Sequence, residues 1–182
     1  MLFRSARLCN DAFVVVSRAT QRNLQRYFGI GDARIRLIYS GIDFDAVDRD
    51  DGRDAVIRRE LGLGNGPVLL NVARLFQQKG QRYLIRAMRT VADRVPGVRL
   101  LIRGEGPDRA ELERMIAELG LGAQVSIIDR YRTHADVLAL MRFCDVFVFP
   151  SLYEGLGIAP IEALALRKPC VASDVGPLPE VI

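Results

Sequence analysis

Three features that mark whole classes of protein are scarce or missing in this sequence of 182 residues. Its three cysteines, Cys9, Cys144 and Cys170, are scattered and odd in number, so they predict small buried residues in a reducing compartment, not a disulfide framework. No apolar run reaches the roughly 18 residues that a membrane span needs. Met1 to Arg4 is followed by charge instead of an apolar segment, so no signal peptide is visible. We therefore expect a cytoplasmic protein.

A strong excess of either charge is also missing. The formal net charge is only +4, and no aromatic side chains gather with basic ones as they do in nucleic-acid-binding domains. We therefore expect no nucleic-acid partner. The mild positive charge suits anionic small molecules or an acidic membrane surface.

The common nucleotide-binding motifs are absent as well. The predicted strand 67–73 is not followed by GxGxxG, which argues against a nicotinamide or flavin dinucleotide. The chain contains no GxxxxGK[ST], which argues against a P-loop nucleotidase.

What the sequence does contain is a regular alternation of short apolar runs and amphipathic stretches. Continuous apolar strands predict a parallel sheet covered on both faces, and their alternation with helices predicts a Rossmann-like, doubly wound α/β fold with right-handed crossovers and strand order 3-2-1-4-5. The predicted strands are 67–73, 98–104, 124–129, 145–151 and 169–174, and the predicted helices are 81–95, 108–120, 135–143 and 158–166.

The two ends of the chain look incomplete. Residues 1–45 predict only two strands (12–17 and 34–39) and one helix (18–28), and the acidic, turn-rich stretch 43–54 is the best linker candidate. The last predicted strand lacks a finished covering helix. We therefore expect a piece of a larger protein, truncated at both ends.

The residues best suited to a ligand leave strands one and four. In this strand order the chain reverses direction between these two strands, and ligands bind in the crevice outside their carboxyl ends. Strand one is followed by RLFQQKG, with Arg74 and Lys79, and strand four by SLYEGLGIAPIE. Two cations can neutralise a diphosphate, and the amides of Gly157 and Ile158 at a helix start can bind an anionic oxygen.

Two glutamates in the second segment complete the pattern. A carboxylate accepts hydrogen bonds from neighbouring hydroxyls, so Glu162 suits a ribose diol and Glu154 the hydroxyls of a sugar. Diphosphate, ribose and sugar together describe a sugar nucleotide. Plainer interpretations stay open: Glu162 as a solvated residue, and the two cations as surface charges. His134, the only histidine, is interpreted as a loop or helix-cap residue ahead of a catalytic base.

Taken in order, several stretches resemble retaining glycosyltransferases of the large GT4-type family, which has the GT-B fold. They are VVVS with SGID, NVARLFQQKG, LLIRGEGPDRAELE, DVFVFPSLYEGLGIAPIEALA and KPCVASDVGPLPEVI. The resemblance covers nearly the whole chain. It implies that residues 46–182 are an incomplete nucleotide-sugar-binding domain and that 1–45 are the end of an N-terminal acceptor domain plus a linker.

The resemblance also implies roles for particular residues. Arg74 and Lys79 would contact the diphosphate, Glu162 the ribose and Glu154 the transferred sugar, with Arg74, Lys79 and Glu154 as the catalytic residues. No metal is implied, because the two cations take the place of a divalent ion. The remaining donor-binding residues would be the loop Gly155, Leu156, Gly157 and Ile158, and, around the base, Gly104, Arg130 and Tyr131.

Two positions depart from the family pattern. Arg167 and Asp129 stand at or near positions that are usually glycine. An arginine at the first is unfavourable if the backbone there needs a positive φ. An acid at the second would place negative charge near the base.

The expected function is transfer of a hexosyl unit from a nucleoside diphosphate sugar to an acceptor hydroxyl, with retention of configuration. The expected partners are the donor, a sugar or lipid-linked acceptor and the missing N-terminal domain, and the full enzyme could contact the inner face of the membrane. Two alternatives remain: a noncatalytic sugar-nucleotide-binding subunit acting with a partner chain, and a sugar-nucleotide epimerase. An epimerase needs acid and base groups near the sugar ring, and this chain offers mainly Glu154.

Overall fold

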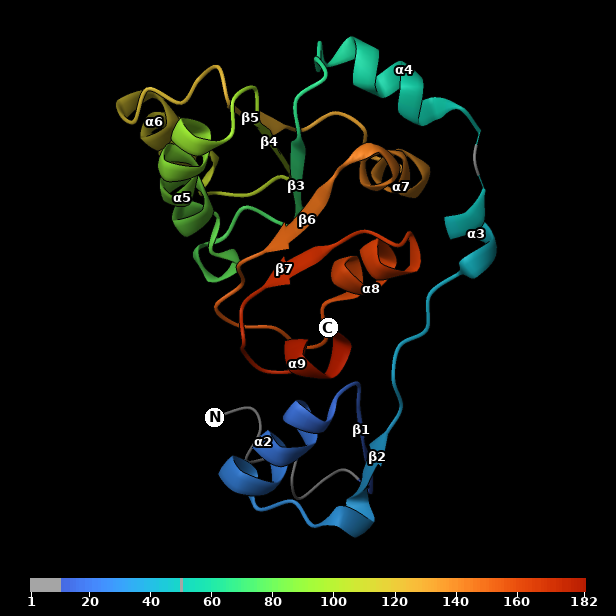
Figure 1. The fold of residues 1–182 in the computed structure, drawn as a ribbon. Coiled ribbons are helices and arrows are strands. Elements are labelled where there is room, and N and C mark those ends of the chain that lie inside the picture. Colours follow the sequence, from blue (N-terminus) through green and yellow to red (C-terminus); the bar gives the residue numbers. More distant parts are fainter. Residues whose placement is uncertain (1–10, 50) are drawn as a thin grey trace.

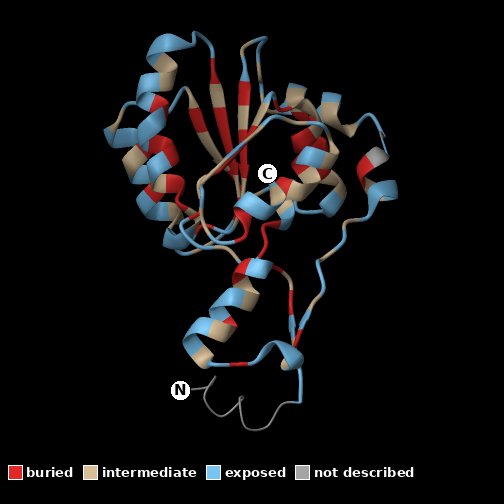
Figure 2. Cartoon of the chain, turned by 60° about the horizontal axis from the view of Figure 1, so that its bottom comes forward, coloured by how far each residue is buried: buried red, intermediate tan, exposed pale blue. Residues whose placement is uncertain are grey.

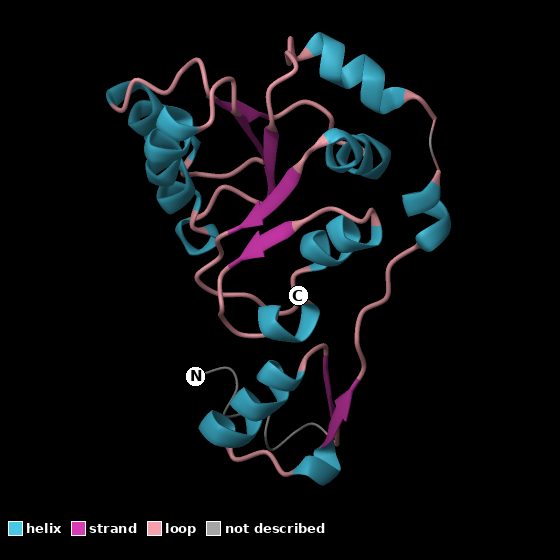
Figure 3. Cartoon of the chain, viewed as in Figure 1, coloured by secondary structure: helices cyan, strands magenta, loops and turns pink. Residues whose placement is uncertain are grey.

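A computed structural model describes residues 11–49 and 51–182, which form two sheets (Figures 1 and 3). The expectations for Cys9 and for the first four residues lie outside the described part. The upper part in Figure 1 is built on a five-stranded sheet and the lower part on a two-stranded sheet.

The five-stranded sheet has the strand order predicted from the sequence. Its strands are β3 (Val68–Val72), β4 (Arg99–Arg103), β5 (Val125–Ile128), β6 (Val146–Phe149) and β7 (Cys170–Ala172). They are all parallel and lie in the order β5-β4-β3-β6-β7, so the predicted order 3-2-1-4-5 and the doubly wound fold are confirmed.

Helices cover both faces of this sheet. On one face lie α5 (Gln81–Arg94) and α6 (Arg109–Glu118), and on the other α7 (His134–Phe143) and α8 (Ile158–Ala165). The buried residues concentrate in the central strands and the helix sides that face them (Figure 2). In α5 the buried positions Leu84, Ile85 and Met88 recur with helical spacing, which is why this stretch folds as a helix against the sheet.

The two-stranded sheet belongs to the N-terminal part of the chain. It pairs β1 (Phe13–Val15) with β2 (Ile35–Leu37) in parallel, and α2 (Arg18–Phe28) and a 3-10 turn (η1, Asp32–Arg34) connect them. Ser17 caps α2 by accepting a hydrogen bond from the amide of Thr20. This part has a small core of its own, formed by Val15, Leu24, Ile30 and Ile35.

The predicted linker 43–54 is partly wrong, because it contains a helix. Residues 38–43 do connect the two parts without a helix or strand, but α3 (Phe44–Asp48) and α4 (Arg53–Glu60) follow. The Asp43 side chain caps α3, and Val47 and Ile57 anchor the two helices in the core beside α7 and α8. The predicted boundary between residues 45 and 46 falls within α3, and the division into two domains stays a prediction.

The prediction of a helix at the C-terminus and the prediction of buried cysteines have different outcomes. The chain ends in a short helix, α9 (Leu178–Val181), as its last residues predict. Cys144 is buried as expected, but Cys170 is only partly buried, because β7 is an edge strand of the sheet. Within the described residues, no helix is both long and apolar enough to cross a membrane.

Candidate functional site

The crevice at the carboxyl ends of β3 and β6 opens because these two strands stop pairing early. Leu70 and Phe147 are their last paired residues, whereas β3 stays paired with β4 as far as Val72. Beyond the last pair, the buried side chain of Asn71 bridges the two strands by donating to the carbonyl oxygen of Val148 at 2.8 Å. This hydrogen bond holds the two strands together one residue beyond their last pair, and the crevice opens after it.

A cavity of about 420 Å³ lies at this end of the sheet. It brings together most of the predicted site residues: Arg74, Lys79, Glu154, Gly155, Leu156, Gly157 and Ile158. Phe149 of β6 and two residues of the N-terminal part, Val16 and Ser40, also line it, and sequence reasoning assigned none of these three to the site. Figure 1 shows the N-terminal part lying below this end of the sheet.

Inside the cavity, Lys79 and Glu154 form an ion pair. Lys79 Nζ lies 2.5 Å from Glu154 Oε1, and the two side chains are only 14% and 7% exposed. Ser151, which is fully buried, donates to the same oxygen at 2.8 Å. The ammonium also lies 5.7 Å from the ring centroid of Phe149. The residues assigned to the diphosphate and to the sugar are thus each other's partners in this structure.

Two loops fix the positions of this pair. Lys79 ends a 3-10 turn, η2 (Gln77–Lys79), and Leu152 donates its amide hydrogen to the carbonyl oxygen of Gln78 at 2.8 Å. Gly80 follows with φ 71°, and a Cβ atom there would lie 2.0 Å from the carbonyl oxygen of Pro150. Only glycine allows the loop after β3 to approach the loop after β6 this closely.

Arg74 is the second cation of the cavity, and it is exposed. Its guanidinium lies over the ring of Phe76, 5.1 Å from the centroid. The backbone at this position is fixed from α5, because Gln81 donates to the carbonyl oxygen of Arg74 at 3.0 Å.

The start of α8 forms the opposite wall of the cavity. Gly157 precedes the helix with φ 89°, and no side chain caps this end of the helix. A helix N-terminus carries unpaired amide hydrogens and a partial positive charge, so this wall favours an anion. Gly155 adds a link to the N-terminal part, because Thr20 Oγ1 donates to its carbonyl oxygen at 3.5 Å.

Glu162 does not line this cavity. It lies one helical turn after Ile158 on α8, and its Oε1 is 2.7 Å from Nε2 of His134. His134 is the first residue of α7, directly after the cap residue Thr133, so it is neither a loop residue nor the cap itself. Its ring contact with Glu162 was not predicted, because 28 positions separate the two residues and no local pattern joins them.

The residues assigned to the base lie at the ends of β4 and β5. Gly104 allows the segment after β4 to approach the segment after β3 closely, since a Cβ atom there would lie 1.9 Å from the carbonyl oxygen of Ala73. Arg130 lies over the ring of Tyr131, 5.1 Å from its centroid. The Tyr131 hydroxyl donates to Glu60 at 2.7 Å, and burial, followed by this hydrogen bond, raises the pKa of Tyr131 to about 12.

The two departures from the family pattern have different structural consequences. Arg167 adopts φ 58°, the left-handed region in which glycine is favoured, so the concern about an arginine at this position is confirmed. Asp129 is paired with Arg109, with an oxygen-to-nitrogen distance of 2.8 Å. Its negative charge near the base region is thus partly neutralised within the chain.

Among residues 11–49 and 51–182, no three or more His, Cys, Asp and Glu side chains gather as a metal site would require.

The order of these segments matches a known family. A family model described as glycosyl transferases group 1 matches residues 54–182. The chain belongs to this family. Because the match includes both cations of the cavity and the whole of α8, the site described above lies within the family's own region of the chain.

Individual relatives match most of the chain. A GDP-mannose-dependent alpha-(1-6)-phosphatidylinositol monomannoside mannosyltransferase of Mycolicibacterium smegmatis is 36% identical over 97% of the chain and 48% of its own length. An alpha-D-kanosaminyltransferase of Streptomyces kanamyceticus is 33% identical over 81% of the chain and 38% of its own length. The chain therefore spans about half, or less, of the length of these relatives.

Solved structures support the same conclusion. The crystal structure of Anabaena HepE (Alr3699) in complex with UDP and glucose superimposes with a TM-score of 0.85 and 27% identity, over 97% of this chain and 48% of that one. The family and the α/β fold are thus established.

Proposed function

We propose that this chain is the donor-binding part of a retaining glycosyltransferase, which passes a hexosyl unit from a nucleoside diphosphate sugar to an acceptor hydroxyl. The observation that carries the proposal is the cavity at the carboxyl ends of β3 and β6. There Arg74 and Lys79 line the same cavity as the uncapped start of α8, and Glu154 is paired with Lys79. The HepE structure, which holds UDP and glucose on a similar fold, supports this choice of ligand.

The diphosphate would bind between the two cations and the amides of Gly157 and Ile158. When the bond to the sugar breaks, negative charge develops on the departing diphosphate. Cations and helix-end amides that are already in place stabilise this charge without reorganisation. This is the catalytic role we assign to Arg74 and Lys79, and it includes no metal ion.

The sugar would displace Lys79 from Glu154. In the ion pair each charge neutralises the other, so a bound donor must replace both partners. Phosphate oxygens would accept from the Lys79 ammonium, and sugar hydroxyls would donate to the Glu154 carboxylate. The ion pair thus neutralises two nearly buried charges, and the donor would take the place of each partner.

The nucleoside would extend from the diphosphate along α8. Glu162 lies one turn beyond the start of this helix and accepts the ribose hydroxyls in our assignment. The base would continue toward Gly104, Arg130 and Tyr131, at the ends of β4 and β5. The aromatic ring and the guanidinium stacked on it offer a flat surface to a base.

The acceptor would be held by a second domain. The chain covers 48% of the length of the Mycolicibacterium smegmatis mannosyltransferase, and we place the sugar or lipid-linked acceptor in the part of such a protein that the chain does not cover. We propose that the complete enzyme acts in the cytoplasm, with the inner face of the membrane as a working location. The chain alone should bind donor weakly and transfer nothing.

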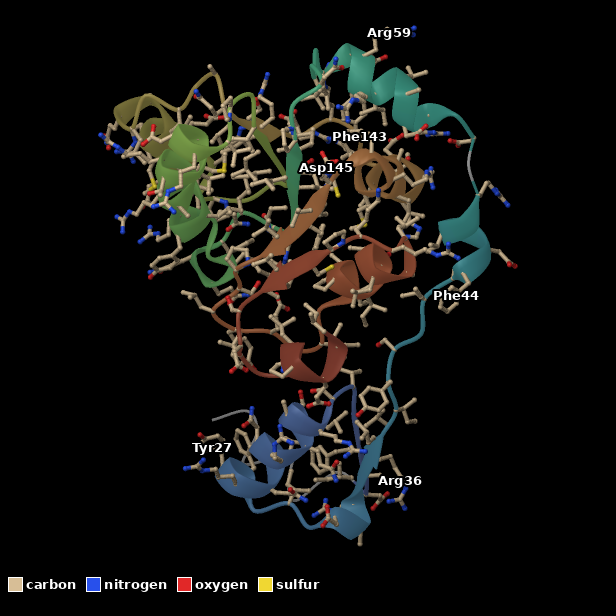
Figure 4. All side chains as sticks on the ribbon, in the orientation of Figure 1. Tyr27, Arg36, Phe44, Arg59, Phe143 and Asp145 are labelled. Atoms are coloured by element: carbon tan, nitrogen blue, oxygen red, sulfur yellow. The ribbon has the colours of Figure 1, made fainter. Side chains whose placement is uncertain are left out.

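A thermal-shift screen of the purified chain against UDP-, GDP- and ADP-sugars tests the proposal. We expect one nucleotide class to raise the melting temperature, and Lys79→Ala to abolish the shift. Lys168→Ala is the matched control, because Lys168 is the only other lysine and does not line the cavity. Arg59→Ala serves in the same way for Arg74→Ala, since Arg59 projects from α4 at the far end of the molecule (Figure 4). Equal losses in the site variants and the controls would contradict the proposal.

A further inference from the structure

The hydrogen bond between His134 and Glu162 joins two neighbouring helices at the proposed ribose position. His134 Nε2 and Glu162 Oε1 are 2.7 Å apart, and the side chains are 53% and 12% exposed. A carboxylate oxygen accepts hydrogen bonds, so Nε2 is the donor. Figure 1 shows α7 and α8, which carry the two residues, side by side on one face of the sheet.

His134 is held in place from its own side. Thr133 and Asp136 form a capping box at the start of α7, and Asp136 is also paired with Arg53 of α4 at 2.7 Å. Hydrogen bonds and an ion pair therefore fix the backbone next to the imidazole, independently of Glu162. An imidazole mounted on a fixed helix start can orient a partner instead of following it.

Glu162 has one oxygen left for a ligand. Its Oε1 takes the imidazole, and within the described residues no hydrogen bond to Oε2 is found. A glutamate side chain has several rotatable bonds, and ordering such a side chain on binding costs conformational entropy. A partner that orders the carboxylate beforehand removes part of that cost.

We propose that His134 is a positioning residue for ribose recognition: it holds the Glu162 carboxylate so that its second oxygen is presented to the ribose diol. This inference rests on the proposed function, in which Glu162 binds the ribose. It adds a residue of α7 to a site otherwise built from the ends of β3 and β6 and from α8. His134 itself touches no part of the donor in this assignment and acts only through Glu162.

The fold does not depend on this side chain. More than half of the imidazole surface is exposed, and the start of α7 is capped by Thr133 and Asp136. Removing the ring therefore leaves the helix with its caps, and its effect should fall on Glu162.

The test compares a ribonucleoside diphosphate with its 2′,3′-dideoxy analogue, using whichever of UDP, GDP and ADP binds the chain most tightly. By ligand-detected NMR titration, the wild-type chain should prefer the ribonucleotide. His134→Ala should weaken ribonucleotide binding about three- to tenfold, as expected for the loss of one hydrogen bond, and leave the dideoxy analogue unchanged. His134→Gln, which keeps an N–H donor at similar reach, should restore most of the loss.

Thr133→Ala is the control for a purely structural effect, because it removes the cap of α7 without touching Glu162. It should lower the melting temperature and keep the wild-type ratio of the two affinities. The inference is overturned if His134→Ala weakens both ligands equally or neither, if His134→Gln behaves like His134→Ala, or if Thr133→Ala changes the ratio as much. A wild-type chain that binds both analogues equally would overturn the ribose role of Glu162 as well. A wild-type chain that binds none of the nucleoside diphosphates would overturn the proposed function itself.

Discussion

Replacing Glu154 with glutamine should make the chain bind a free nucleoside diphosphate more tightly. Glu154 competes with phosphate for Lys79, because the two side chains form an ion pair at 2.5 Å. Glutamine keeps the shape of the side chain and an acceptor for Ser151 but removes the negative charge. Lys79 is then left as a nearly buried cation that needs an anion.

The magnitude follows from the burial of the pair. Hydrogen bonds to charged groups contribute about 1.5–3 kcal/mol net, and removing one partner of a buried ion pair costs about 3–5 kcal/mol. Because the amide still accepts a hydrogen bond, we take the lower end, about 1.5 kcal/mol, which is slightly more than a tenfold gain in affinity. The free energy of unfolding of the ligand-free protein should fall by a similar amount and recover when the diphosphate binds.

Isothermal titration calorimetry with the nucleoside mono- and diphosphate measures the effect. The diphosphate should gain more than the monophosphate. Glu111→Gln is the control, since Glu111 also pairs with a cation, Arg82, but on the surface and away from the cavity. Unchanged or weaker diphosphate binding by Glu154→Gln would show that the pair does not oppose the ligand, and the assignment of Lys79 to the diphosphate would fail.

Three further variants test other parts of the structure. Arg74→Ala and Lys79→Ala should each weaken diphosphate binding about tenfold or more in calorimetry, and monophosphate binding much less. Equal losses for the diphosphate and the monophosphate would show that the two cations do not bind the diphosphate. Gly157→Ala should destabilise the chain by about 1–3 kcal/mol in denaturant unfolding, because φ is 89° and the new methyl group would lie 2.9 Å from Leu178; unchanged stability would contradict the need for glycine before α8. Arg167→Gly should stabilise it by up to about 1 kcal/mol, because φ is 58°; a loss of stability would show that the arginine side chain contributes more than its backbone costs.

The main sheet and the edge that carries the site could be predicted because they depend on local patterns. Continuous apolar runs such as 67–73 and 145–151 specify buried parallel strands, and the strand order then places Arg74 and Lys79 opposite the start of α8. The helices α3 and α4 were missed because each buries little: Ile57 is the one buried residue of α4, among arginines and acids.

The contacts inside the site could not be predicted, because they join distant positions. Lys79 and Glu154 are 75 positions apart, and the sequence alone assigns them to separate parts of the donor. On that assignment Glu154→Gln would hardly affect a free diphosphate, and the ion pair reverses this expectation. In the same way, the places of Val16 and Ser40 in the cavity wall depend on how the N-terminal part packs below the sheet.

A crystal structure of the chain with a bound sugar nucleotide tests the central claim most directly. We predict the diphosphate between Arg74, Lys79 and the amide of Gly157, with Glu154 released from Lys79 and within hydrogen-bond distance of the sugar hydroxyls. The ribose should lie at Glu162. A donor bound elsewhere, or a diphosphate in this cavity with the Lys79–Glu154 pair intact, would contradict the account.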